Sequence, residues 1–157
     1  MPTRAMPEPR TFEASIRDVE FDENVTVIEP CNLYECHIGR DSFIGPFCEI
    51  QKGARIGDRT KIQSHSFICE LVTIGDDCFI GHGVMFINDT FAKGGPAEGD
   101  TSLWSSTRIG NRVSIGSNAT LLPVDICDDV VIGAGAVVTK SITEPGTYAG
   151  NPARKLS

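Results

Sequence analysis

The feature that most constrains the fold is a hydrophobic residue at every sixth position from Ile38 to Phe86. The series consists of Ile38, Ile44, Ile50, Ile56, Ile62, Ile68, Ile74, Ile80 and Phe86. A period of six matches neither the 3.6-residue period of an amphipathic helix nor the two-residue alternation of a half-buried strand. It does match a parallel β-helix, in which short strands and turns alternate and each coil rests on the previous one.

Three hexapeptides make one triangular coil, so the series predicts three internal columns. Ile38, Ile56 and Ile74 form one column, Ile44, Ile62 and Ile80 the second, and Ile50, Ile68 and Phe86 the third. The fourth residue after each member is small or β-branched, and we expect it inside, near a corner. These residues are Ser42, Cys48, Ala54, Thr60, Ser66, Val72, Cys78, Val84 and Thr90.

This series resembles the motif of the hexapeptide-repeat family. That motif consists of an aliphatic residue, a glycine, two free positions, a small residue and one further residue. The resemblance implies an all-β fold, a left-handed parallel β-helix. Periodicity alone predicts the coil and not its hand, and the usual rule for crossover connections would favour a right-handed one.

The repeat also predicts the domain organisation. We expect an N-terminal arm and entry segment at 1–24, with a loose arm over Met1–Arg10, a β-helix at 25–142 and a C-terminal tail at 143–157. The repeat stops for one long loop, 88–108, and such loops are more often functional than idle. It then resumes and skips one residue between Leu121 and Ile126.

Composition excludes several classes of function. The net charge of −7 argues against nucleic-acid binding. No apolar run approaches the roughly 18 residues of a membrane span, and no secretory leader is visible, so we expect a cytoplasmic protein without a membrane segment. Small interior positions hold Cys48 and Cys78, so we interpret the six cysteines as reduced structural thiols.

Two C-terminal stretches, VIGAGAVVTK at 131–140 and AGNPAR at 149–154, resemble the signature of acetyl-CoA-dependent hexapeptide acyltransferases. Small residues keep the backbone accessible to a pantetheine arm, and basic side chains can pair with CoA phosphates. The alternative is that the glycines and alanines only permit tight coil packing. The candidate cofactor-binding residues are Ser117, Asn118, Ala119, Gly133, Ala134, Gly135, Ala136, Lys140, Pro152, Arg154 and Lys155.

The mouth of the loop, Phe86–Asp89, supplies two candidate catalytic residues. It resembles the FIND-type motif of nucleotide-sugar N-acetyltransferases of lipopolysaccharide O-antigen biosynthesis, whereas the galactoside and chloramphenicol acetyltransferase branch has Asn-His there. Asp89 replaces that histidine, so Asn88 would orient an amine and Asp89 would accept or relay its proton. The alternative is an Asx turn that only begins the loop.

The histidines give further candidates for a general base, because histidine changes charge near neutral pH. We expect His65 and His82 on adjacent coils near similar corners, with His82 on the face that leads to Asn88, and we interpret His37 as structural. A γ-type carbonic anhydrase needs three metal-binding histidines, two of them in an H-x-x-x-x-H spacing, which this chain lacks; we expect no metal.

The resemblance therefore implies an acetyl-CoA-dependent N-acetyltransferase and a homotrimer. The amine of a UDP- or dTDP-linked amino sugar would attack the thioester directly. Two alternatives remain: a sugar O-acetyltransferase with His82 or His65 as base, and a non-catalytic β-helix scaffold. The sequence leaves open the sugar, the nucleotide, the acetylated position and whether the acyl group is acetyl, formyl or succinyl.

Overall fold

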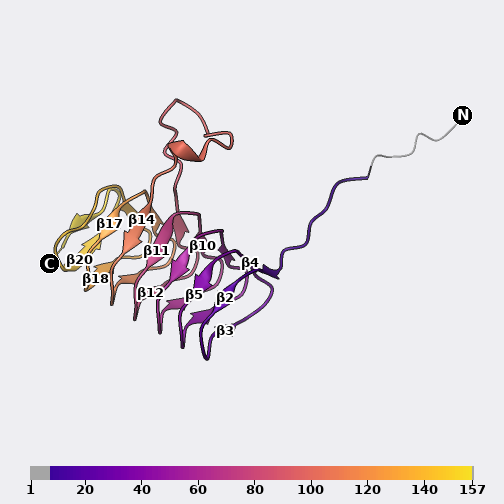
Figure 1. The fold of residues 1–157 in the computed structure, drawn as a ribbon. Helices are drawn as coiled ribbons and strands as arrows, with labels where there is room; N and C mark the ends of the chain where they lie inside the picture. Colours follow the sequence, from indigo (N-terminus) through magenta and orange to yellow (C-terminus); the bar gives the residue numbers. More distant parts are fainter. Residues whose placement is uncertain (1–7, 157) are drawn as a thin grey trace, which may run out of the picture.

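The computed structural model describes residues 8–156 and shows a left-handed, three-sided parallel β-helix from which one loop protrudes (Figure 1). The fold class predicted from the six-residue period is therefore confirmed. In this range the only helix is the short 3-10 helix η1 (Thr101–Leu103), which lies in the protruding loop. None of the described helices is long and apolar enough to cross a membrane.

The strands form three sheets, one on each side of the coil. Sheet A contains β1 (Ile16–Arg17), β4 (Asn32–Tyr34), β7 (Glu49–Ile50), β10 (Phe67–Ile68), β13 (Met85–Phe86), β16 (Thr120–Leu121) and β19 (Val137–Val138). Sheet B contains β2 (Glu20–Phe21), β5 (His37–Ile38), β8 (Arg55–Ile56), β11 (Val72–Ile74), β14 (Thr107–Ile109) and β17 (Asp125–Ile126). Sheet C contains β3 (Thr26–Val27), β6 (Phe43–Ile44), β9 (Lys61–Ile62), β12 (Phe79–Ile80), β15 (Ser114–Ile115), β18 (Val130–Ile132), β20 (Gly146–Ala149) and β21 (Arg154–Lys155).

 All neighbouring strands pair in parallel except β20 (Gly146–Ala149) and β21, which are antiparallel.

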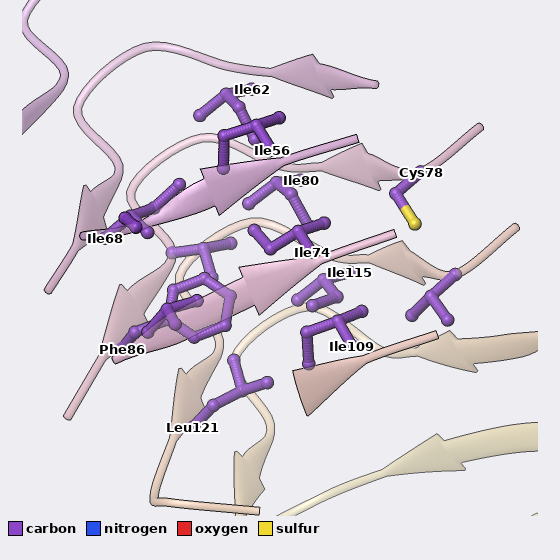
Figure 2. Close-up of a cluster of buried hydrophobic side chains, with 14 of the residues drawn as sticks. Ile56, Ile62, Ile68, Ile74, Cys78, Ile80, Phe86, Ile109, Ile115 and Leu121 are labelled. Carbon is purple, nitrogen blue, oxygen red and sulfur yellow. The ribbon is translucent and has the colours of Figure 1, made fainter. Parts of the chain in front are cut away.

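The three predicted columns are confirmed by the strand register. Ile38 pairs with Ile56 and Ile56 with Ile74 in sheet B, and the column continues through Ile109 to Ile126. Figure 2 shows the side chains of successive coils stacked inside the triangle in this way. Each of these side chains is almost fully buried. Burying one isoleucine contributes about 1.5–3 kcal/mol relative to exposure, so the stacked columns hold the coils together.

The small residues after each column member lie inside the corners, as expected, with one exception. Ser42, Thr60 and Ser66 are buried, and each hydroxyl donates to a backbone carbonyl of the next coil over 2.8–2.9 Å. These bonds satisfy polar groups that would otherwise be costly to bury. Thr90 is exposed, because the chain has already left the coil for the loop at this position.

The corners take their names from the sheets that they join. At each corner one residue of most coils has a positive φ, and at corner CA these residues are Phe47, His65, Gly83, Asn118 and Gly135. The long loop leaves at corner AB, between β13 and β14. The skipped residue between Leu121 and Ile126 falls at the same corner, and the column still continues because Ile109 pairs with Ile126.

Both ends of the β-helix differ from the boundaries expected from the repeat. Parallel pairing already begins at β1 and β2, before residue 25, because these strands pair with β4 and β5. At the other end, β20 in the expected tail continues sheet C by pairing with β18. Residues 1–7 of the expected arm, like residue 157, lie outside the described residues.

Candidate functional site

Corner CA brings His82 together with a partner from the preceding coil. The Oγ atom of Ser64 lies 2.9 Å from Nδ1 of His82, and the two residues are 18 positions apart, which is one coil. His82 is exposed. The contact with Ser64 orients the imidazole at the surface and leaves Nε2 as the ring nitrogen that can contact a ligand.

The glycines on both sides of His82 let the next coil approach it closely. A Cβ atom at Gly81 would lie 2.7 Å from the carbonyl oxygen of Ile115. Gly83 has a φ of +64°, and a Cβ atom there would lie 2.6 Å from Oδ1 of Asn118. The backbone N–H of Asn118 donates to the backbone carbonyl oxygen of His82 over 2.8 Å. The side chain of Asn118 therefore lies over Gly83, beside His82.

His65 lies at the same corner, one coil before His82, as the sequence spacing predicts. It occupies the positive-φ position, at +64°, and its backbone N–H donates to the carbonyl oxygen of Pro46. Its ring packs against Phe47 with a centroid separation of 4.9 Å and an interplanar angle of 32°. The two histidines thus occupy adjacent positions of the corner and have different partners.

The candidate cofactor-binding residues of coils after His82 continue the same corner. The N–H of Gly135 donates to the carbonyl oxygen of Ser117 over 2.9 Å, and Ala134 and Gly135 are exposed. A Cβ atom at Gly135 would meet nothing within 4 Å, so this surface is open. Gly133 differs, because a Cβ atom there would lie 2.9 Å from Cβ of Ala149. Gly133 therefore serves close packing, whereas Gly135 leaves backbone accessible.

Ala119 and Ala136 occupy the interior of the corner. Both side chains are fully buried, and their carbonyl oxygens accept from Met85 and Thr120. Their side chains therefore lie inside the coil, and the expected backbone contact of these two alanines with a pantetheine arm stays a prediction. The small side chain is required by the narrow interior.

The basic candidates lie apart from His82. Lys140 is exposed near corner AB, and Arg154 and Pro152 are exposed in the tail that folds back beside β20. Lys155 Nζ lies 2.9 Å from a carboxylate oxygen of Glu144. The hydrogen bond to Glu144 raises the pKa of Lys155, and the same bond lowers the pKa of Glu144. Lys155 is thus already engaged, whereas within residues 8–156 neither Lys140 nor Arg154 forms an ion pair.

Asn88 and Asp89 lie at corner AB, at the base of the loop. The side-chain amide of Asn88 donates to the carbonyl oxygen of Glu70 over 3.3 Å. The carboxylate of Asp89 accepts from the backbone N–H of Phe91 over 2.9 Å and from that of Ala97 over 2.7 Å. The contact between Asp89 and Phe91 is the Asx turn expected as the alternative to a catalytic role. Strand β13 separates these residues from His82, so the structure places the two groups at opposite ends of one side of the coil.

Sequence reasoning did not single out Ser64 or Phe47. The signal for Ser64 was present, because it precedes His82 by one full coil. Within residues 8–156, no three His, Cys, Asp or Glu side chains form a group that could hold a metal ion.

Comparison with protein families agrees with this fold. The family described as "Hexapeptide repeat of succinyl-transferase" matches residues 71–85 and 106–140. The family described as "Bacterial transferase hexapeptide (six repeats)" matches residues 35–70. Together these matches cover more than half of the chain.

Curated relatives include the bifunctional protein GlmU of Clostridium botulinum and of Latilactobacillus sakei. The first is 34% identical over 111 residues, or 70% of this chain and 22% of the relative. The second is 39% identical over 109 residues, or 68% of this chain and 21% of the relative. The chain therefore spans about a fifth of the length of these relatives.

Solved structures with the same fold include a hexapeptide-repeat acetyltransferase from Vibrio cholerae in complex with acetyl-CoA. It is 27% identical, with a TM-score of 0.64 over 77% of this chain and 69% of that chain. A variant of the N-acyltransferase AntD from Bacillus cereus, in complex with dTDP and coenzyme A, is 19% identical, with a TM-score of 0.69 over 88% of this chain and 82% of that chain. From its repeats, its coil and these matches, the chain belongs to the bacterial hexapeptide-repeat transferases.

Proposed function

We propose that this chain is an acetyl-CoA-dependent N-acetyltransferase that acts on the amine of a nucleotide-linked amino sugar. The observation that carries the proposal is His82, which is exposed and held through Nδ1 by Ser64. On the following coils, the same corner presents the exposed residues Ala134 and Gly135, and a Cβ atom at Gly135 would meet nothing within 4 Å. A candidate base therefore lies beside a surface suited to an extended pantetheine arm.

The similar structures support this choice of substrates. The Vibrio cholerae acetyltransferase was solved with acetyl-CoA, and the AntD variant with dTDP and coenzyme A. A variant of perosamine N-acetyltransferase from Caulobacter crescentus was solved with CoA and GDP-perosamine; it is 18% identical, with a TM-score of 0.63 over 90% of this chain and 57% of that chain. These complexes make a CoA thioester and a nucleotide-linked amino sugar the first substrates to test.

The contacts of His82 suit a general base. When Nδ1–H donates to Ser64 Oγ, the lone pair of Nε2 is free to accept the proton that the amine loses as its nitrogen forms the new bond to the acyl carbon. Acetyl-CoA supplies the acyl group as a reactive thioester. The protonated His82 can then return the proton to the thiolate when the carbon–sulfur bond breaks, so the products are an amide and a free thiol. The amine attacks directly, and no residue of the chain carries the acyl group.

The remaining candidates take supporting roles in this proposal. Asn88 and Asp89 hold the base of the loop, because their side chains are bonded to backbone groups. Lys140 and Arg154 are exposed cations that could pair with the CoA phosphates.

We also propose the homotrimer, the cytoplasmic location and the part in lipopolysaccharide biosynthesis that the resemblance implies. Exposed apolar side chains on the flat faces, such as Phe79, Met85 and Val131, support contact between copies of the chain. All six cysteines are free thiols, which suits a reducing compartment.

The test is release of the CoA thiol with paired acceptors. One panel holds 3-amino and 4-amino nucleotide sugars, and the other holds the matching hydroxyl sugars. We expect turnover with amines only. We expect His82→Ala to lower kcat by about 10²- to 10⁴-fold, the range typical of a general base, with little change in CoA affinity.

The matched control is His37→Ala, because His37 lies in sheet B beside Asp22 and away from corner CA. It should retain wild-type turnover. Turnover with hydroxyl sugars that is lost in His82→Ala would instead indicate a sugar O-acetyltransferase. Absence of turnover in both panels, together with no CoA binding in calorimetry, would contradict acyl transfer and favour a scaffold.

A further inference from the structure

A hollow lies at the N-terminal side of the corner that carries His82. It has a volume of about 280 Å³, and its lining includes Pro30, Cys31, Asn32, Phe47 and Glu49. Backbone hydrogen bonds connect it to His82 coil by coil, from Phe47 to Pro30, from His65 to Pro46 and from Gly83 to Ser64. Phe47 is therefore two coils from His82, or about 10 Å along the axis at 4.8 Å per coil. A nucleotide sugar that lies along the corner would have its ribose, diphosphate and hexose between the two residues.

Phe47 contributes an exposed aromatic side chain to the lining of this hollow. Its side chain is 56% exposed, and its φ of +61° is unusual for a bulky residue. The other positive-φ residues of corner CA are His65, Gly83, Asn118 and Gly135, which are residue types that tolerate a positive φ more readily. Phe47 therefore adds backbone strain without filling the core, and its only aromatic neighbour within residues 8–156 is the ring of His65. Such a ring is suited to stacking with a ligand.

Asn32 and Glu49 give the hollow a polar edge with a defined pattern. They are register partners in sheet A, and both are half-buried. Arg17 donates to Oδ1 of Asn32 over 3.1 Å, and Gln51 donates to Oε1 of Glu49 over 2.7 Å. These contacts leave the amide N–H groups of Asn32 as donors and the second carboxylate oxygen of Glu49 as an acceptor. The edge therefore offers one donor beside one acceptor.

We propose, resting on the function proposed above, that this hollow binds the base of the acceptor nucleotide and selects a base with a ring N–H beside a carbonyl. Uracil, thymine and guanine have this edge, whereas adenine and cytosine have an unprotonated ring nitrogen beside an amino group. The base stacks on Phe47, its ring N–H donates to Glu49, and its carbonyl accepts from Asn32.

The size and charge of the hollow agree with this occupant. Its volume lies just below the roughly 300–1,000 Å³ of sites for whole ligands, so it suits one ring system. The carboxylate of Glu49 repels phosphate, so on this proposal the diphosphate lies outside the hollow. The amine of the sugar then reaches His82 from the N-terminal side, while CoA occupies the later coils of the same corner.

The test is binding of UDP, dTDP, GDP, CDP and ADP to the full chain, measured by calorimetry. We expect UDP, dTDP or GDP to bind at least tenfold more tightly than CDP and ADP. Phe47→Leu should weaken the preferred nucleotide by about 5- to 150-fold, the range for loss of one base–aromatic stack. Glu49→Gln should reduce the preference over CDP and ADP, because an amide can donate as well as accept.

The matched control is Phe91→Leu, a similarly exposed phenylalanine with a positive φ in the protruding loop, which should leave nucleotide affinity unchanged. We expect every variant to bind CoA with wild-type affinity, and this measurement is the control for an intact fold. Equal binding of all five nucleotides, no nucleotide binding, or wild-type affinity in Phe47→Leu would overturn the base site while leaving acyl transfer in place. Loss of CoA binding in the wild type would instead contradict the proposed function, and the nucleotide panel would still report on the hollow.

Discussion

At the scale of single residues, a β-helix makes neighbours of residues that lie one coil apart. Ser64 reaches His82 in this way, and Asn118 reaches the position over Gly83 from the following coil. A corner residue thus has partners on both sides along the axis. His82 gains a fixed ring orientation from this arrangement while it stays exposed.

The first prediction concerns Ser64 as a positioning residue. Ser64→Ala removes one hydrogen bond to His82, and a bond of this kind contributes about 0.5–1.5 kcal/mol, so we expect kcat to fall by about 2- to 10-fold. The KM for acetyl-CoA should stay unchanged, and Ser64→Thr should restore kcat because it keeps the hydroxyl. Steady-state kinetics measure both constants. Wild-type kcat in Ser64→Ala would show that Ser64 does not orient the base.

The second prediction concerns the thiols. Burial raises the pKa of Cys36 and of Cys48 to about 11 and that of Cys69 to about 12. Because the thiolate is the reactive form, the native chain at pH 8 should react slowly with a colorimetric thiol reagent. Only Cys127 is half-buried rather than buried, so Cys127→Ser should remove any fast phase.

The same reagent should detect all six thiols once the chain is unfolded in guanidinium. This count is the control for the native measurement. Rapid reaction of several thiols in the native chain would mean that the coils open readily. Reaction of these protein thiols would also add a background signal to the assay that detects the CoA thiol.

At the scale of elements, the loop and the corners show how local contacts are fixed. The loop leaves the coil at corner AB, and both oxygens of the Asp89 carboxylate bind its backbone N–H groups. Asp89 also forms an isolated β-bridge with Trp104, which closes the base of the loop. The loop protrudes from the body (Figure 1), so its order depends on these few contacts and not on the core.

We therefore predict that Asp89→Ala loosens the loop without unfolding the body. Amide hydrogen exchange at 90–104 should become faster, while the thermal midpoint of the chain changes little, because the columns lie elsewhere. Asp89→Asn should have a smaller effect, since it keeps one acceptor oxygen. A large fall in the thermal midpoint of Asp89→Ala would contradict a role confined to the loop.

Corner BC carries a ladder of ion pairs that predicts a pH dependence. Arg59 binds Asp77, and Arg112 binds Asp129, each with nitrogen–oxygen distances from 2.7 Å. Hydrogen bonding from these arginines lowers the pKa of Asp77 and of Asp129 below the usual value of 3.8. A carboxylate with a lowered pKa stabilises the fold above its unfolded pKa, and this contribution is lost as pH falls through the folded pKa.

We predict that the free energy of unfolding decreases as pH falls from about 5 toward 2, and that this decrease is smaller in the Asp77→Asn, Asp129→Asn double variant. Urea midpoints at pH 7, 5 and 3 measure the effect. Glu98→Gln, in the loop and outside the ladder, serves as the control. Because the pairs are exposed, the effect should also shrink in high salt. An unchanged pH dependence in the double variant would show that other groups cause the acid sensitivity.

At the scale of the whole molecule, the sequence predicts what repeats and misses what occurs once. The columns from Ile38 to Phe86 and the skip before Ile126 follow from spacing, because each coil must place a large side chain inside. The expected start of the β-helix at residue 25 leaves out β1 and β2, because Ile16 and Phe21 are exposed there and the pattern is weak. The contacts of Asp89 and the hollow beside Phe47 depend on irregular backbone, which has no period to reveal it.

A stack of this kind also predicts where stability resides. Each coil contacts only its neighbours, so a cavity in a middle coil weakens two interfaces and one at the end weakens a single interface. Ile74 lies between Ile56 and Ile109, whereas Ile142 of the last coil bridges only Ile126 within residues 8–156. We therefore predict that Ile74→Ala lowers the free energy of unfolding by about 2–5 kcal/mol and that Ile142→Ala lowers it by less. Urea unfolding of the two variants measures the difference, and equal losses would show that the coils do not act as nearest-neighbour units.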